Sequence, residues 1–270
     1  MNKMILALKR HWPEYLIEAW GLGVFMVAAG IVGTLLFYPQ SPIHQTITNP
    51  WMQRVVMGLG MGLTAIAIMY SPWGKRSGAH INPAVTLTFY RLNKIAGWDA
   101  FFYIIFQFIG GFLGVVIVAL LLRDPFTQAP VDYVVTVPGK LGVLAALLGE
   151  YLIAVIMMGM VLYTSNQPKL ERFTPFFAGC LIVSYVIFES PLSGFGMNPA
   201  RTVASALPSG IWTAIWLYFV APITGMLTAA ELYLRMIGHR NIFCAKLYHD
   251  PLYRCIHCGH LIHWHRPHLR

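Results

Sequence analysis

A ten-residue segment occurs twice in this chain, and the second copy begins 116 positions after the first. Residues 77–86 read Ser-Gly-Ala-His-Ile-Asn-Pro-Ala-Val-Thr, and residues 193–202 read Ser-Gly-Phe-Gly-Met-Asn-Pro-Ala-Arg-Thr, with six of the ten positions identical. Both copies interrupt very hydrophobic sequence. Matched breaks in two membrane-embedded halves are typical of an inverted repeat with a pore at its centre. The alternative, two unrelated Asn-Pro turns in loops, does not explain the matched context.

The composition is that of a membrane protein: 57% of the residues are hydrophobic, 11% are charged, and the mean hydropathy is +0.61. These values exclude a soluble domain of ordinary composition. A helix that crosses a bilayer needs about 20 mostly apolar residues. Six stretches are predicted to span, the second and fifth of them short: residues 15–38, 55–70, 100–122, 141–164, 175–188 and 212–236. None alternates like a strand, so the sequence predicts an all-α membrane protein.

The positive charges predict the orientation of the spans, because Lys and Arg accumulate in cytoplasmic loops. With the N-terminus inside, fifteen of the 19 Lys and Arg residues are cytoplasmic, and only Arg54, Arg123, Lys140 and Arg201 lie on the other side. We therefore expect a multi-pass protein of a plasma membrane or bacterial inner membrane with both termini in the cytoplasm. The net charge of +9 then reflects topology and contact with anionic membrane lipids, and it does not point to a nucleic-acid partner.

Three spans in each half make the second half enter the membrane from the opposite side. The first motif then dips in from the cytoplasm and the second from outside. We expect a channel domain over residues 15–237, with halves of about 15–122 and 140–237. It would lie between a cytoplasmic N-terminus, residues 1–14, and a cytoplasmic Cys/His-rich basic tail, residues 238–270.

Each copy of the repeat also carries a helix start signal, Asn at the N-cap followed by Pro at the first helical position. Two half-helices are expected, one starting with Asn82, Pro83 and Ala84 and ending near Tyr90, the other starting with Asn198, Pro199 and Ala200 and ending near Leu207. Their N-termini, meeting at mid-membrane, would present two positive dipole ends that repel cations. The side-chain oxygen of each Asn can cap its helix, which leaves the NH2 donors free to face a passing molecule.

Backbone outside a helix is tolerated at membrane depth only where it is buried in protein or lines a wet cavity. The loop carbonyls would therefore offer hydrogen-bond acceptors along a pore, from Gly78, Ala79, His80, Gly194, Phe195 and Gly196. A water that accepts hydrogen bonds from both Asn side chains has no lone pair left for its neighbour. The proton wire is then broken, and neutral hydrogen-bonding solutes pass while ions are rejected.

The paired motif resembles the signature of the aquaporin, or major intrinsic protein, family, and the resemblance extends from about Tyr15 to Met236. It implies six spanning helices with two re-entrant half-helices, a homotetramer with one pore per subunit, and passage of water and small uncharged solutes without a cofactor. It also implies that Glu18 and Glu150 are buried carboxylates that support the loops, and that Gln107 is a buried structural residue. A proton relay through the two glutamates is the alternative.

Four positions set the outer constriction in the family, and by resemblance they fall on Met61, Val186, Phe195 and Arg201. The position in the second span is Met61 if one residue is inserted before Arg76, and Gly62 otherwise. By the same resemblance, Arg201 donates to the permeant and repels cations. Ionisable residues inside apolar segments are functional candidates; the alternative is an arginine that extends to the membrane surface.

Strict water channels of this family usually pair Phe in the second span with His in the fifth, whereas glycerol facilitators have Trp, a small residue and Phe. This chain has Met, Val and Phe and matches neither pattern. An apolar wall suits carbon-bearing solutes, but Thr202 stands where glycerol facilitators have Asp. Water is therefore the first solute expected. A facilitator of glycerol, urea or hydrogen peroxide, with water secondary, is the alternative.

The tail beyond Met236 is rich in cysteine and histidine. A Cys-x2-Cys pair with nearby histidines can supply four tetrahedral zinc ligands, and the best set is Cys244, His249, Cys255 and Cys258. The family implies nothing for this segment. A disordered basic tail that binds metal weakly or lies on the membrane is the alternative. A metal-bound tail could close the cytoplasmic mouth, for which the sequence alone offers no evidence.

Other functional classes fit the sequence less well. A membrane-embedded enzyme needs clustered catalytic groups at membrane depth, and the glutamates here are single and far apart, so no enzymatic activity is expected. Coupled transport would need an intramembrane ion site. A metal-responsive or structural membrane protein with a closed pore is the third class, and removing the tail distinguishes it from a channel.

Overall fold

The computed structural model describes residues 3–238 and 242–258. In these two ranges the chain forms helices and turns and no strand. Six of the helices are long and apolar enough to cross a membrane: α1 Lys3–Phe37, α3 Pro50–Tyr70, α6 Gly97–Leu122, α8 Gly142–Ser165, α9 Thr174–Phe188 with the turn preceding it, and α12 Leu217–Ile237. The prediction of an all-α membrane protein with six spans is confirmed.

Shorter helices connect these spans. The described part of the chain adds α2 Pro42–Thr46, α4 Pro72–Ser77, α5 Pro83–Arg91, α7 Asp124–Thr127, α10 Ser190–Ser193 and α11 Pro199–Ser209, with 3-10 turns at Asp132–Val134 and Glu171–Phe173. Helices α5 and α11 are the half-helices expected after the repeated motif. Each begins at the proline that follows the capping asparagine.

Three helix starts differ from those expected by five residues or more, and one of them is α3, which begins at Pro50 instead of residue 55. Helix α1 begins at Lys3 instead of residue 15, because polar side chains near its start are bound by other helices. His11 Nδ1 lies 2.8 Å from Asp99 Oδ1, and Glu14 accepts a hydrogen bond of 3.0 Å from Arg76 Nε. Helix α12 begins only at Leu217, since residues 213–216 form turns. Hydropathy detects the apolar core of a span but not these polar contacts at its ends.

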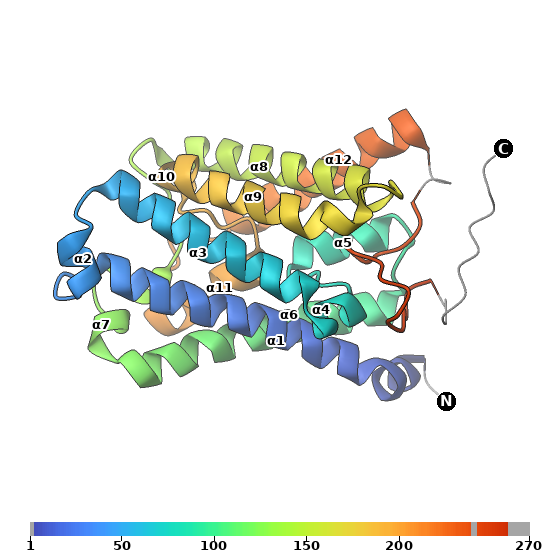
Figure 1. Cartoon of the computed structure of the whole chain (residues 1–270), viewed down its shortest axis with the longest axis horizontal. Coiled ribbons are helices and arrows are strands. Elements are labelled where there is room, and N and C mark those ends of the chain that lie inside the picture. Colours follow the sequence, from blue (N-terminus) through green and yellow to red (C-terminus); the bar gives the residue numbers. More distant parts are fainter. Residues whose placement is uncertain (1–2, 239–241, 259–270) are drawn as a thin grey trace.

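The long helices pack in a pattern that repeats between the halves. Helix α1 packs against α6, and α8 packs against α12 in the same way, while α3 packs against α9 and joins the two halves (Figure 1). Small residues permit the close approach: a Cβ on Gly110 of α6 would lie 2.0 Å from the carbonyl oxygen of Ala19 in α1. The half-helices α5 and α11 lie between these pairs, where they contact each other and α6 and α12.

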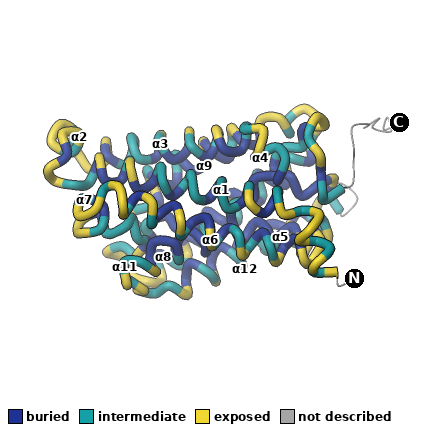
Figure 2. Tube along the Cα trace, turned by 90° about the horizontal axis from the view of Figure 1, so that it is seen from below, coloured by how far each residue is buried: buried dark blue, intermediate teal, exposed yellow. Residues whose placement is uncertain are grey.

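The outer faces of the spanning helices are apolar. Large exposed side chains include Leu63 on α3, Leu120 on α6 and Leu144 on α8. Figure 2 shows exposed positions distributed along the long helices, with buried positions facing the interior. An exposed apolar surface of this extent is unstable in water and suits a lipid environment. The start of helix α1 and the described tail segment, residues 242–258, lie at the same end of the molecule (Figure 1).

Candidate functional site

Two re-entrant loops leave their short helices by the same backbone path. After α4, Gly78, Ala79 and Ile81 have φ values of 103°, 53° and 41°. After α10, Gly194, Phe195 and Met197 have φ values of 80°, 56° and 46°. A non-glycine residue in this left-handed region costs roughly 1–3 kcal/mol, so both loops require strong interactions that hold them in place.

Two buried carboxylates supply those interactions. Glu18 of α1 accepts hydrogen bonds from the Ser77 hydroxyl at 2.8 Å and from the backbone N–H groups of His80 and Ile81 at 3.1 and 2.6 Å. Glu150 of α8 accepts from the Ser193 hydroxyl and from the N–H groups of Gly196 and Met197, each within 2.6 Å. Both glutamates are fully buried. The carboxylates therefore occupy the loop-supporting positions, with the serine hydroxyl and the two loop N–H donors matched between the halves.

Two tyrosines that the sequence reasoning missed complete these anchors. The Tyr103 hydroxyl of α6 donates to the Ser77 carbonyl at 2.8 Å, and the Tyr218 hydroxyl of α12 donates to the Ser193 carbonyl. Tyr103 lies 26 residues after Ser77, and Tyr218 lies 25 residues after Ser193. This nearly equal spacing in the third span of each half was the sequence signal that could have identified them.

Gln107 supports the first loop and has no equivalent among the described residues of the second half. Its Nε2 donates to Glu18 Oε2 at 2.9 Å and to Thr86 Oγ1 at 3.1 Å, so it links the carboxylate to the half-helix α5. In the second half, Thr202 of α11 instead contacts Thr136 through their hydroxyl groups at 3.1 Å. The two loops are thus held by equivalent carboxylates and by different side chains around the half-helices.

The two asparagines face each other's loops. Asn82 Oδ1 accepts from the Ala84 N–H at 2.8 Å, and Asn198 Oδ1 accepts from the Ala200 N–H at 3.1 Å, so both cap their helices. Each Nδ2 also donates to the opposite loop at 2.8 Å, Asn82 to the Met197 carbonyl and Asn198 to the Ile81 carbonyl. The expectation that both hydrogens of each NH2 are free was wrong, because one hydrogen on each side ties the loops together.

A cavity of about 320 Å³ runs past both asparagines. It is lined at one end by Phe37, Arg54 and Pro130, and at the other by Leu247 of the tail. Of the predicted pore residues, the lining includes Ala79, His80, Asn82, Gly194, Phe195, Gly196 and Asn198. Gly78 is not among the lining residues: its carbonyl, expected to face the pore, accepts a hydrogen bond from the Leu247 N–H at 3.2 Å. Pro83, Ala84, Pro199 and Ala200 are buried and do not line the cavity.

All four predicted constriction residues also line this cavity: Met61, Val186, Phe195 and Arg201. Gly62, the other option for the second span, instead contacts α9, where an added Cβ would lie 2.7 Å from the Gly179 carbonyl oxygen. Arg201 is 8% exposed, and its Nη1 has no hydrogen-bond partner within the described residues. An unpartnered buried donor beside a cavity is available to a permeating molecule.

The four cysteine and histidine residues predicted as metal ligands converge in the tail. The Sγ atoms of Cys244 and Cys255 are 3.4 Å apart, and His249 Nε2 lies 3.2 Å from Cys258 Sγ. All four ligand atoms lie within 4.8 Å of one another. Tetrahedral zinc, with Zn–S of about 2.3 Å and Zn–N of about 2.0 Å, places its ligand atoms roughly 3.5–3.8 Å apart. The residues present therefore fit a Cys3His site after small shifts.

Comparisons with known proteins place this architecture in a family. Residues 7–233 match the family described as Major intrinsic protein. Aquaporin-4 of Mus musculus is 32% identical over 241 residues, which are 86% of this chain and 71% of that protein. Putative aquaporin NIP4-1 of Arabidopsis thaliana is 33% identical over 174 residues, or 64% of this chain. The matched region is only 59% of that plant protein's length.

A solved structure has the same fold. The aquaglyceroporin of Plasmodium falciparum superposes with a TM-score of 0.70 over 86% of this chain and 98% of its own, at 22% sequence identity. Members of the matched family are passive channels, not enzymes, and they need no cofactor. The chain is therefore a multi-pass membrane protein of the major intrinsic protein family, to which the aquaporin channels belong.

Proposed function

We propose that this channel conducts water first and small neutral solutes second. The observation that carries the proposal is the pair Asn82 and Asn198 on one continuous cavity, each with an amide hydrogen beyond the one used between the loops. These two donors can orient a water molecule between them. The Arg201 guanidinium offers a further unpartnered N–H along the same path.

Ions and protons are expected to be excluded for two electrostatic reasons. The N-termini of α5 and α11 carry partial positive charge toward the asparagines. Arg201 adds a full positive charge at the cavity wall. A cation in transit loses its hydration shell and meets both, whereas a neutral solute exchanges its water contacts for hydrogen bonds to the pore.

The apolar wall of the cavity favours carbon-bearing solutes as the alternative cargo. Val186 and Phe195 contribute apolar surface, and several methionines, Met57, Met61, Met157 and Met226 among them, also line the cavity. Methionine side chains adapt their shape to the molecule they contact. Glycerol, urea and hydrogen peroxide are therefore the solutes to compare with water.

The remaining features of the proposal concern placement and assembly. We place the channel in a plasma membrane or bacterial inner membrane, with both termini cytoplasmic, in contact with lipids and assembled as a homotetramer. The charge distribution among the loops supports the orientation. The channel domain, residues 15–237, needs no cofactor, and we assign a zinc ion to Cys244, His249, Cys255 and Cys258 of the tail.

Stopped-flow measurements on reconstituted vesicles test the proposed solutes. Water permeability above that of empty vesicles, with weaker permeation of glycerol and urea, is expected. Exchanging Val186→His adds a polar group to the apolar wall and should lower glycerol permeation roughly tenfold, equivalent to about 1.4 kcal/mol, while water still passes. If glycerol passes readily and water does not exceed empty lipid, the ranking of solutes is wrong.

A further inference from the structure

The described tail segment, residues 242–258, lies against the loop that follows α4. The Ala245 carbonyl is 2.7 Å from His80 Nε2, which must be the protonated ring nitrogen because a carbonyl only accepts. The Leu247 N–H donates to the Gly78 carbonyl at 3.2 Å. The side chains of Ile242, Ala245 and Leu247 are buried in the main core. The tail thus packs as part of the channel body.

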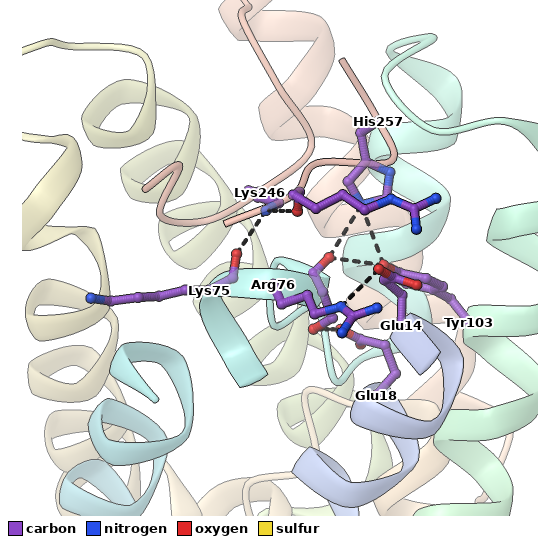
Figure 3. Close-up of polar contacts among 9 residues, drawn as sticks. Glu14, Glu18, Lys75, Arg76, Tyr103, Lys246 and His257 are labelled. Carbon is purple, nitrogen blue, oxygen red and sulfur yellow. Dashed lines mark hydrogen bonds and ion pairs between the residues drawn. The ribbon is translucent and has the colours of Figure 1, made fainter. Parts of the chain in front are cut away.

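Two basic side chains of the tail extend these contacts to the α4 end of the loop (Figure 3). Lys246 is 1% exposed, and its Nζ donates to the carbonyls of Lys75 and Arg254 at 2.7 and 2.8 Å. His257 Nε2 lies 3.2 Å from the Ser77 carbonyl, to which Tyr103 also donates. The tail is therefore bonded to the same loop that the Glu18 carboxylate supports.

Leu247 brings this contact into the pore. It is the one described tail residue that lines the cavity, where it lies with Ala79 and His80 of the loop. An apolar side chain across a narrow water path creates a hydrophobic constriction, which stops conduction by excluding water. In the proposed orientation this constriction is at the cytoplasmic mouth.

The tail has little regular structure to hold Leu247 in that position. The four ligand residues enclose the relevant segment, since Cys244 and His249 flank Leu247 while Cys255 and Cys258 close the loop from its far end. An ion bound to all four would cross-link this segment and reduce the entropy lost when it docks. Without the ion, three thiol groups and an imidazole lie close together, and the contacts between them are weaker than bonds to zinc.

The charges near the ligands also suit a zinc–thiolate centre. Zinc with three thiolates and a neutral histidine carries a net charge of −1, and buried charge requires a partner. The ammonium group of Lys246 donates to the carbonyl of Arg254, which directly precedes the ligand Cys255, and supplies an opposite charge nearby. Farther out, Asp250 pairs with Lys75 at 3.0 Å. This hydrogen bond raises the pKa of Lys75, so the lysine stays charged at neutral pH.

We propose that a zinc ion bound by Cys244, His249, Cys255 and Cys258 holds the tail across the cytoplasmic mouth, so that Leu247 closes the pore and loss of the ion opens it. This gate rests on the proposed channel function and on the proposed zinc site. It makes the metal a regulator of permeation and assigns it no part in the passage of solute.

The test uses the full chain in vesicles, with bound zinc measured by elemental analysis and water permeability by stopped flow. The purified protein should carry one zinc per chain and conduct slowly. A membrane-permeant zinc chelator, or the double exchange Cys255→Ser and Cys258→Ser, should raise water permeability several-fold. Cys180→Ser is the matched control, because that cysteine is exposed on α9 away from the cluster, and it should behave as the unaltered chain.

Leu247→Ala separates binding of the metal from closure. This variant should retain zinc and yet conduct as fast as the chelated protein. If zinc binds but neither its removal nor Leu247→Ala changes permeability, the gate is wrong while the channel stands. If no zinc is bound, the metal site and the gate are both wrong. If the chelated protein and Leu247→Ala both fail to exceed empty lipid, the channel function itself fails.

Discussion

A single buried carboxylate stabilises the backbone conformation of each re-entrant loop. Glu150 accepts three hydrogen bonds from a loop whose Phe195 and Met197 adopt left-handed backbone conformations. Hydrogen bonds to a charged group contribute more than neutral ones, and a buried donor left without an acceptor is costly. The loop geometry that exposes pore carbonyls therefore depends on a residue that does not touch the pore.

Replacing Glu150 by Gln tests this dependence. The amide has one acceptor oxygen in place of two and presents an NH2 group to a backbone N–H, so we expect a loss of about 2–4 kcal/mol in the free energy of unfolding. Thermal unfolding in detergent measures it. Glu231→Gln is the control, because the Glu231 side chain on α12 is 42% exposed and should change stability little. Equal effects of the two exchanges would contradict the assigned role.

Arg201 offers a second test at the scale of one residue. A unit charge about 5 Å from a permeating cation raises its energy by roughly 3 kcal/mol at an effective dielectric constant near 20. Arg201→Val should therefore raise methylammonium flux into vesicles by up to about two hundredfold, with a smaller effect on water. Arg91→Val, at an exposed ion pair with Glu231, should leave cation flux unchanged. If the methylammonium flux of Arg201→Val does not rise, Arg201 has no part in excluding cations.

At the scale of elements, the contact between α1 and α6 depends on glycine. A Cβ on Gly110 would meet the backbone of Ala19, which cannot move aside as a flexible side chain can. Gly110→Ala should force the helices apart at a cost of about 1–3 kcal/mol, typical of overpacking. Gly159→Ala in α8 is the matched control, since nothing lies within 4 Å of its added Cβ. Thermal unfolding of both variants measures the difference in stability. Similar melting temperatures would contradict the role assigned to Gly110.

Much of the element order could be predicted from local sequence, and the exceptions have physical reasons. The asparagine caps and the prolines after them are local signals, so the starts of α5 and α11 were predictable. The equivalence of Glu18 in the first half to Glu150 in the second followed from the repeat. The docking of the tail was not predictable, because the contact of Ala245 with His80 joins residues 165 positions apart and has no periodic pattern. The early start of α1 depended on contacts with Asp99 and Arg76.

At the scale of the whole molecule, the exposed apolar faces of the spans must be covered by lipid or by other copies of the chain. We expect four copies to associate. Native mass spectrometry from a mild detergent should then detect a particle four times the mass of the 30.3 kDa chain. Its abundance should not depend on zinc, because the tail packs on its own subunit's loop. A monomer under all mild conditions would contradict the tetramer.

The hydrogen bonds of Glu18 and Glu150 have a consequence for how the protein is made. Glu18 receives its loop partners from residues 59 to 63 positions later in the chain, and Glu150 from residues 43 to 47 positions later. Each leading helix is therefore synthesised before the residues that donate to its carboxylate. A charged residue at the centre of a helix costs about 2.5–3.5 kcal/mol on insertion scales. We expect α1 and α8 to wait beside the translocon until their loops emerge, so that each half enters lipid as one unit.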